Sequence, residues 1–342
     1  MTKKSKRRSS DARQGIVDSI VATRISSRAL SDNKHLKRYL KQYFENVPYE
    51  DLAGRSEEIM ARIAVEHLEF GAARRRGQAL MRIYNATKKT HGYASNFTFV
   101  EMVNDDMPFL VDSVAAAINR HGLGVHITVH PIVSVHRDGK GKLTGIAAAE
   151  DDEAIRESYI RFAISRETDA QELWKLRQEI NKVLADVRVA VRDWGKMRAA
   201  MRETRDMLAN GPKGADPLLR TESQALLDWM VDEHFTFLGY REYRVVRKGK
   251  RTFLEAIPDT GLGVLSHESS MHKPVELTTA MQRLRRSRDW LILTKANSRS
   301  TVHRTAFLDY VGVKIYDDNG NVTGERRFIG LLTSIAYSES PT

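Results

Sequence analysis

The sequence predicts an α+β fold with two antiparallel sheets, and three observations carry this prediction. First, apolar residues recur about every 3.6 positions in some segments, as in a helix, and at every second position in others, as in a strand. Second, several strand segments are joined by hairpin turns, such as RDGKGK at 137–142 and DNG at 318–320. Third, the segment GPKGADP at 211–217 has the composition of a linker and separates two sets of such elements.

The first 30 residues hold a large share of the net charge of +11. Eight Lys and Arg side chains stand against Asp11 and Asp18, which gives +6 for residues 1–30 alone. We expect a disordered basic tail here, with an electrostatic tether to nucleic acid or an acidic partner as the alternative. No RNA-binding or zinc-finger pattern supports that alternative, so nucleic acid is not expected as a partner.

Residues 31–90 predict a helical module that leads into the first sheet. Apolar residues at helical spacing indicate helices over 35–43 and 56–70. The stretch VPYEDLAG between them contains Pro48 and Gly54 and is expected to be extended. A short strand over 80–84 follows.

Residues 91–210 change period from strand to helix and back. Strands are expected over 96–103, 125–136, 143–149 and 158–165, with a first helix over 107–121 closed by Gly122 and a second helix capped by Asp169. This order is that of a ferredoxin-like sandwich, in which two helices cover one face of an antiparallel sheet.

The second helix of this domain continues far beyond what one sheet requires. Its apolar seam alternates steps of three and four residues and comprises Leu173, Leu176, Ile180, Val183, Val187, Val191, Trp194, Met197 and Met201. A break near Gly195 would shorten the helix. The seam either packs inside the chain or forms a contact between subunits, and both interpretations remain open.

Residues 218–342 predict a second, mostly antiparallel α+β domain. An amphipathic helix over 222–233 precedes two strands joined by a turn at 248–250. A helix over 277–286 and a strand over 290–294 come next, followed by two long alternating strands on either side of the DNG turn.

Several classes of chemistry are excluded by what the sequence lacks. It contains no cysteine, no GxxxxGK[ST] loop and no complete GxGxxG motif, so neither thiolate chemistry nor a nucleotide cofactor is expected in this chain. His126 and His130 lie about 13 Å apart on one strand face, too far for a shared metal ion. No signal peptide or run of 18 apolar residues occurs, which favours a cytoplasmic protein without a membrane span.

The stretch NDDMPFLVDSVAAAINRHG at 104–122 is the candidate site. Asp105 or Asp106 could cap the helix with Pro108 in its first turn, and Asp112 is expected on the solvent side. The alternatives are an effector-binding loop formed by Asn104, Asp105 and Asp106, and paired catalytic carboxylates.

Four blocks of sequence, in this order, resemble the N-terminal region of the large bacterial NAD-dependent glutamate dehydrogenases: VNDDMPFLVDSVAAAINRHGLGVHITVHPIVSVHRDGKG, HFTFLGYREY, LTKANSRSTVHR and DYVGVKIYDDNGNVTGERRFIGLLTS. VPYEDLAGRS and MRIYN are similar to that family as well. The resemblance begins near residue 33 and leaves only the basic tail outside.

The resemblance implies an ACT-like domain over 91–210 and a PAS-like domain over 218–342, placed before a catalytic domain. In that family the parent enzyme converts L-glutamate, NAD and water to 2-oxoglutarate, ammonia and NADH. The family's catalytic lysine and dinucleotide loop do not occur in these residues, so we expect no catalytic residues, no bound NAD and no activity in this chain alone.

The resemblance also implies a regulatory and assembly role, with self-association and a small amino-acid effector near Asn104, Asp105 and Asp106. The alternative is a free-standing amino-acid sensor or scaffold that lacks an enzyme.

Overall fold

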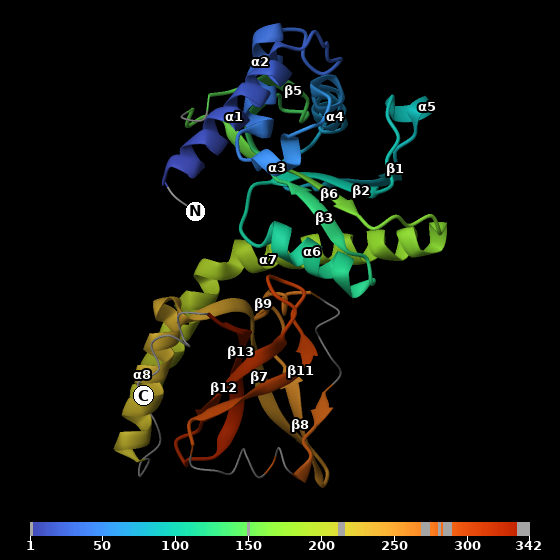
Figure 1. Cartoon of the computed structure of the whole chain (residues 1–342). Helices are drawn as coiled ribbons and strands as arrows, with labels where there is room; N and C mark the ends of the chain where they lie inside the picture. Colours follow the sequence, from blue (N-terminus) through green and yellow to red (C-terminus); the bar gives the residue numbers. More distant parts are fainter. Residues whose placement is uncertain are drawn as a thin grey trace. The chain divides into compact units, whose positions relative to one another are not determined.

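The computed structural model describes residues 3–148, 151–210, 216–267, 274–279, 282 and 289–333. The chain divides into two compact units, Met1–Asn181 and Lys182–Thr342, and each unit has its own antiparallel sheet (Figure 1). The predicted α+β class is therefore confirmed. Within the described ranges, no helix is both long enough and apolar enough to cross a membrane.

Four helices open the first unit: α1 Lys3–Ala22, α2 Asn33–Phe44, α3 Tyr49–Leu52 and α4 Glu57–Phe70. The predictions for α2 and α4 are confirmed, and the caps explain where both begin. Asp32 accepts a hydrogen bond from the Lys34 amide, and Ser56 accepts one from the Ile59 amide. The segment predicted as extended contains the single turn α3, which starts directly after Pro48 because proline suits the start of a helix.

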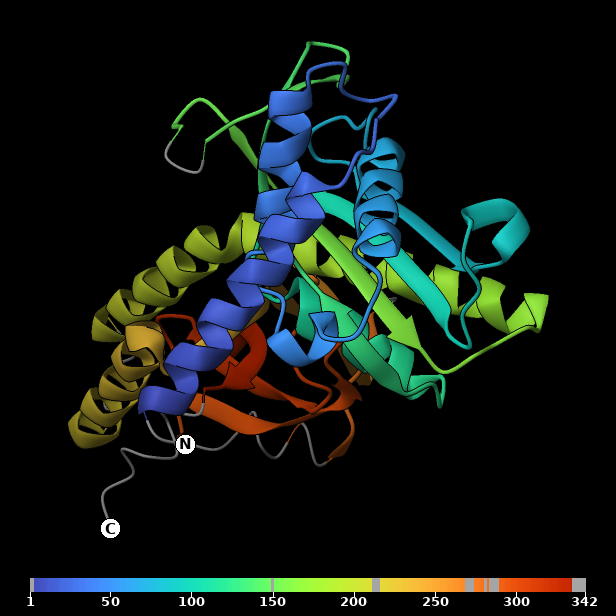
Figure 2. The same cartoon turned by 45° about the horizontal axis from the view of Figure 1, so that its top comes forward.

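Helix α1 corrects the prediction of a disordered tail over residues 1–30. Val17 and Ile20 are buried with the side chains of α2 and α4, and Ile16 and Val21 pack against the same cluster. Their spacing of three and four residues places them on one side of α1. Figure 2 shows α1 lying against α2. The prediction of disorder was based on the many charges of this segment and did not take the short apolar stripe into account.

Six strands form the first sheet: β1 Leu80–Asn85, β2 Thr98–Asp105, β3 Val125–Val129, β4 Ile132–Arg137, β5 Leu143–Ile146 and β6 Ile155–Ile164. Their order is β1-β2-β6-β4-β5, with β3 also paired to β6. The short helix α5, Lys88–His91, follows β1, and α6, Leu110–Arg120, follows β2.

This sheet has the ferredoxin-like order with one exchange of strands. In a β-α-β-β-α-β unit the fourth strand lies beside the first. Here the edge beside β2 is occupied by β1, which precedes the unit in the sequence. The helices α6 and the first part of α7 cover one face of the sheet, and α1 to α4 cover the other (Figure 1).

The strand predicted over 125–136 is divided into β3 and β4 at His130 and Pro131. Both halves pair with β6, and the Pro131 carbonyl still accepts a hydrogen bond from the Tyr159 amide. Proline has no amide hydrogen to donate, so the ladder is interrupted at that point.

Helix α7 runs without interruption from Ala170 to Met207, so the predicted break at Gly195 does not occur. Asp169 caps it as expected, through hydrogen bonds from the Gln171 and Glu172 amides. Most of the apolar seam is buried inside the chain: Leu176, Ile180, Val183, Val187, Met197 and Met201.

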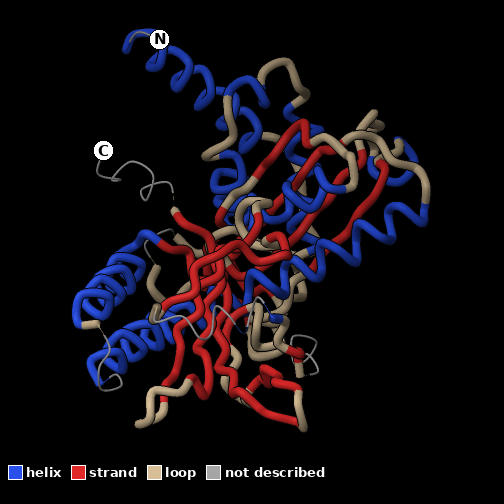
Figure 3. Tube along the Cα trace, turned by 90° about the horizontal axis from the view of Figure 1, so that it is seen from below, coloured by secondary structure: helices blue, strands red, loops and turns tan. Residues whose placement is uncertain are grey.

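The second unit continues from α7 with three helical segments: η1 Leu208–Asn210, α8 Pro217–Trp229 and η2 Met230–His234. Its strands are β7 Phe235–Lys248, β8 Arg251–Ala256, β9 Leu262–Gly263, β10 Val275–Glu276, β11 Leu291–Arg299, β12 Phe307–Tyr316 and β13 Val322–Leu332. Figure 3 shows these strands in red and the helices in blue. Residues 211–215 of the predicted linker and most of the predicted helix over 277–286 lie outside the described residues.

The second sheet has the order β10-β8-β7-β13-β12-β11, with β9 on β7, and every pair is antiparallel. Met197 and Met201 of α7 pack with Leu227 of α8 against Phe237 and Phe328 of the sheet. The predicted mostly antiparallel α+β arrangement is therefore confirmed for this unit.

Candidate functional site

The loop between β2 and α6 contains the three residues that the sequence singled out. Helix α6 begins at Leu110, and its N-cap is Phe109, which has a left-handed φ of 71° and no side-chain cap. The prediction that Asp105 or Asp106 caps the helix is therefore wrong. The Asp106 amide donates to the Arg156 carbonyl at 3.0 Å, so the chain is still bound to the sheet at this residue.

Asn104 and Asp105 are the last two residues of β2, directly before the loop. Asn104 is fully buried. The Asp105 carboxylate accepts hydrogen bonds from Arg74 Nη2 at 2.8 Å and from the Gly77 amide at 2.9 Å. Asp105 therefore ties the start of the loop to Arg74 and Gly77, and the buried Asn104 precedes it in the strand.

Asp106 lines a hollow at the start of α6. A cavity of about 420 Å³ is lined by residues 106–112 and His130. Asp106 Oδ1 accepts a hydrogen bond from Ser158 Oγ at 2.8 Å, and Asp106 Oδ2 lies 3.4 Å from Arg156 Nη2. Burial lowers the pKa of His130, and the nearby Asp106 opposes that shift.

A second group of charges lies on the face of the sheet that the helical module covers. Glu101 of β2 is fully buried and pairs with Arg161 of β6 and with Arg82 Nε at 2.7 Å. Tyr84 donates to Glu101 Oε1 at 2.9 Å, and Arg161 Nη2 donates to the Tyr93 hydroxyl at 3.0 Å. Burial raises the pKa of Glu101, but His67, which is protonated in acid, and the charges of Arg161 and Arg82 outweigh it and lower the value to about 2.

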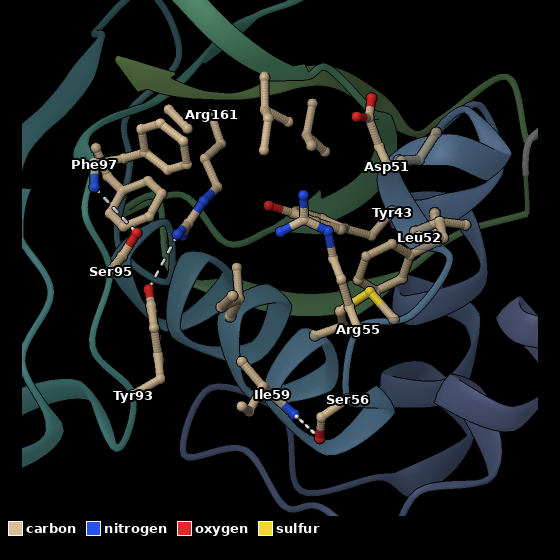
Figure 4. A pocket seen from close by; sticks show the side chains of 18 of the residues that line it. Tyr43, Asp51, Leu52, Arg55, Ser56, Ile59, Tyr93, Ser95, Phe97 and Arg161 are labelled. Carbon is tan, nitrogen blue, oxygen red and sulfur yellow. Dashed lines mark hydrogen bonds between the residues drawn. The ribbon is translucent and has the colours of Figure 1, made fainter. Parts of the chain in front are cut away.

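Beside this group lies a hollow of about 320 Å³, which we call the module pocket. Figure 4 shows it between helices of the module and the sheet, with Arg161 and Phe97 on one side and Arg55 and Tyr43 on the other. Most of the lining is apolar or aromatic, and Asp51 supplies a carboxylate.

The sequence reasoning did not identify the module pocket. A signal was present, because Glu101 in FVEMV and Arg161 in SYIRFAIS are charged residues inside otherwise apolar strands. A charge at a buried strand position requires a partner, and the partners here come from other strands.

Among the described residues, no three His, Asp or Glu side chains gather closely enough to hold a metal ion. His126 and His130 are engaged separately: His126 Nε2 lies 3.1 Å from Ser165 Oγ, and His130 Nε2 lies 3.0 Å from Ser158 Oγ.

The family match and the three relatives described below all point to glutamate dehydrogenases. Residues 39–180 match the family described as "Glutamate dehydrogenase, ACT1 domain". The NAD-specific glutamate dehydrogenase of Halomonas elongata is 32% identical over 329 residues, which cover 93% of this chain and 20% of the relative. That of Pseudomonas aeruginosa is 35% identical over 269 residues, covering 78% of the chain and 17% of the relative.

A more distant NAD-specific glutamate dehydrogenase, from Mycobacterium tuberculosis, is 25% identical over 275 residues. The chain spans about a fifth of the length of the curated relatives it matches. Residues 39–180 therefore match the ACT1 domain of glutamate dehydrogenases, and the chain over most of its length is similar to the NAD-specific glutamate dehydrogenases.

Proposed function

We propose that this chain is the regulatory and assembly part of a cytoplasmic NAD-dependent glutamate dehydrogenase. The parent enzyme would convert L-glutamate, NAD and water to 2-oxoglutarate, ammonia and NADH, with NAD bound in a catalytic domain outside these residues. The observation that carries this proposal is the ACT1 match over residues 39–180, within a stretch similar to NAD-specific glutamate dehydrogenases over 93% of the chain.

The regulatory role requires an effector, and we propose a small amino acid in the hollow beside the β2–α6 loop. The N-cap residue of α6, Phe109, supplies no side-chain cap, and the positive end of a helix dipole attracts a carboxylate. Asp106 lines the same hollow and offers an oxygen to an ammonium group. Asn104 and Asp105 contribute by holding the loop, since Asp105 is bound to Arg74 and Gly77.

The experiment is a thermal melt of the purified chain with each common amino acid at millimolar concentration. We expect at least one amino acid to raise the melting temperature by a few degrees, because a ligand that binds only the folded state stabilises it. Asp106→Asn should reduce that rise, and Asp152→Asn, an exposed change of the same kind, should leave it intact. An unchanged melting temperature across the whole panel would contradict amino-acid sensing by this chain.

The assembly role requires self-association, and we propose that it uses the exposed side of α7. Most of the apolar seam is buried inside the chain, but Trp194 of the seam is 45% exposed, and Trp174, which lies outside the seam, is 60% exposed. Large exposed aromatic side chains are enriched at protein interfaces.

A further inference from the structure

The module pocket has a wall suited to an apolar body. Phe44, Val47, Phe97, Ile127 and Val129 are among the side chains that line it. Its volume of about 320 Å³ lies at the lower end of the range found for small-molecule sites, which is about 300 to 1,000 Å³. A small molecule with an apolar side chain would therefore fit it.

The buried charges beside the pocket are already satisfied by one another. Arg161 pairs with Glu101, donates to Tyr84 and Tyr93, and lies 3.9 Å from the centre of the Phe99 ring. These groups therefore shape the wall and leave the recognition of a charged ligand to other residues.

Arg55 and Asp51 are the remaining charged residues that line the pocket. Figure 4 shows the Arg55 side chain reaching over Tyr43 into the hollow. Neither Arg55 nor Asp51 makes a side-chain hydrogen bond or ion pair with any residue that the structure describes, and they do not pair with each other. A guanidinium that faces an apolar hollow without a partner is suited to a carboxylate, because its fork of N–H donors matches the two oxygens.

We propose that the module pocket is a second ligand site, separate from the β2–α6 loop, for a small carboxylate with an apolar side chain the size of leucine or phenylalanine. Arg55 binds the carboxylate, and the aromatic and aliphatic wall encloses the side chain. The site lies among the module helices and the sheet, so an occupant ties the two layers together.

Two kinds of compound share this chemistry, the apolar amino acids and the 2-oxo acids that correspond to them. Asp51 distinguishes them, because its carboxylate attracts the ammonium group of an amino acid, whereas the 2-oxo acid has no ammonium group and a net negative charge. We therefore expect the amino acids to bind more tightly than the 2-oxo acids, and Asp51→Asn to remove that preference.

The test is titration calorimetry on the full chain with L-leucine, L-phenylalanine, 4-methyl-2-oxopentanoate and phenylpyruvate. At least one of these compounds should bind, and Arg55→Gln should weaken that binding about tenfold, as the loss of one charge-assisted contact. Arg76→Gln is the matched control, because Arg76 is exposed and does not line the pocket. It should change the affinity by less than about twofold.

Because Arg55 is exposed, Arg55→Gln should melt at the same temperature as the wild type. A loss of binding in this variant would then come from the changed pocket and not from unfolding. No binding of the four compounds at millimolar concentration would overturn the proposal. Binding that survives Arg55→Gln but is lost in Asp106→Asn would also overturn it and would assign the ligand to the β2–α6 loop. Loss in Arg55→Gln alone would support the pocket while leaving the loop proposal to its own test.

Discussion

Two glutamates, Glu101 in β2 and Glu157 in the neighbouring strand β6, are fully buried and form ion pairs with arginines. Glu157 of β6 accepts hydrogen bonds from Arg74 Nη2 at 2.6 Å and from Arg137 Nε at 2.7 Å, and it is fully buried. Arg74 also reaches Asp105, which is partly exposed. Breaking a buried pair leaves an uncompensated charge, whereas a partly exposed partner can be replaced by water.

We therefore predict a large difference between two conservative changes in this network. Glu157→Gln should lower the free energy of unfolding by about 3 to 5 kcal/mol, because two buried guanidinium groups lose their shared carboxylate. Asp105→Asn should cost about 1 kcal/mol, since Arg74 keeps Glu157 and the amide can still accept from Gly77. Urea unfolding of both variants measures the difference, and equal losses would contradict this assignment of roles.

His67 of α4 is buried as a neutral side chain. Its Nε2 lies 3.1 Å from the Met102 carbonyl, which can only accept, so the ring proton sits on Nε2. Nδ1 then accepts from the Tyr43 hydroxyl at 3.0 Å. Burial is the main cause that lowers the pKa of His67 from 6.5 to about 4.

This pKa predicts a loss of stability in mild acid. In the unfolded chain His67 takes up a proton near pH 6.5, while in the folded chain it does so only near pH 4. The unfolded state therefore binds more protons between these values, and the free energy of unfolding should fall by about 3 kcal/mol as the pH decreases through that window. Melting curves against pH would show a shallower decline for His67→Gln than for wild type, and an unchanged decline for the exposed control His126→Gln.

At the scale of elements, the sequence predicted helices and strands whose period is set by one buried face. Helices α2 and α4 and the hairpin strands fall into this class, because their apolar spacing is regular over several turns or residues. The prediction failed for α1, whose short apolar stripe stands among many charges, and for the start of α6. There the Asp106 amide is bound by Arg156 of another strand, a contact between residues about 50 positions apart that local spacing does not contain.

Two glycines of the second unit, one in a helix and one in a strand, predict opposite effects. A Cβ at Gly195 in α7 would meet nothing within 4 Å, so Gly195→Ala should stabilise the protein by about 0.5 to 1 kcal/mol through the lower entropy of the unfolded chain. A Cβ at Gly263 in β9 would lie 2.2 Å from the Leu238 carbonyl oxygen, and its φ is +58°. Gly263→Ala should therefore lower the melting temperature, and a stable Gly263→Ala protein would show that β9 is placed differently.

At the scale of the whole molecule, the candidate sites show what the sequence can and cannot predict. The β2–α6 loop was found because its polar residues are contiguous in the sequence. The module pocket was missed because it joins Arg55 to Phe97 and Arg161, which are far apart along the chain. Only the fold brings these residues around one hollow, and the buried charges of β2 and β6 were its only trace in the sequence.

Self-association can be tested at an exposed side chain of α7 but not in its buried seam. Val187 is fully buried, so a charged residue there would disrupt the fold rather than an interface. Trp174 is 60% exposed on α7, and an indole left in water is a suitable anchor for a second subunit. Light scattering should give a wild-type mass above the 38.9 kDa of one chain, and Trp174→Glu should reduce it towards that value.

Leu218→Glu is the control, because Leu218 is 64% exposed on α8 and lies outside the proposed interface, so this change should leave the mass unaltered. A wild-type protein of one-chain mass at high micromolar concentration would exclude self-association of this chain alone.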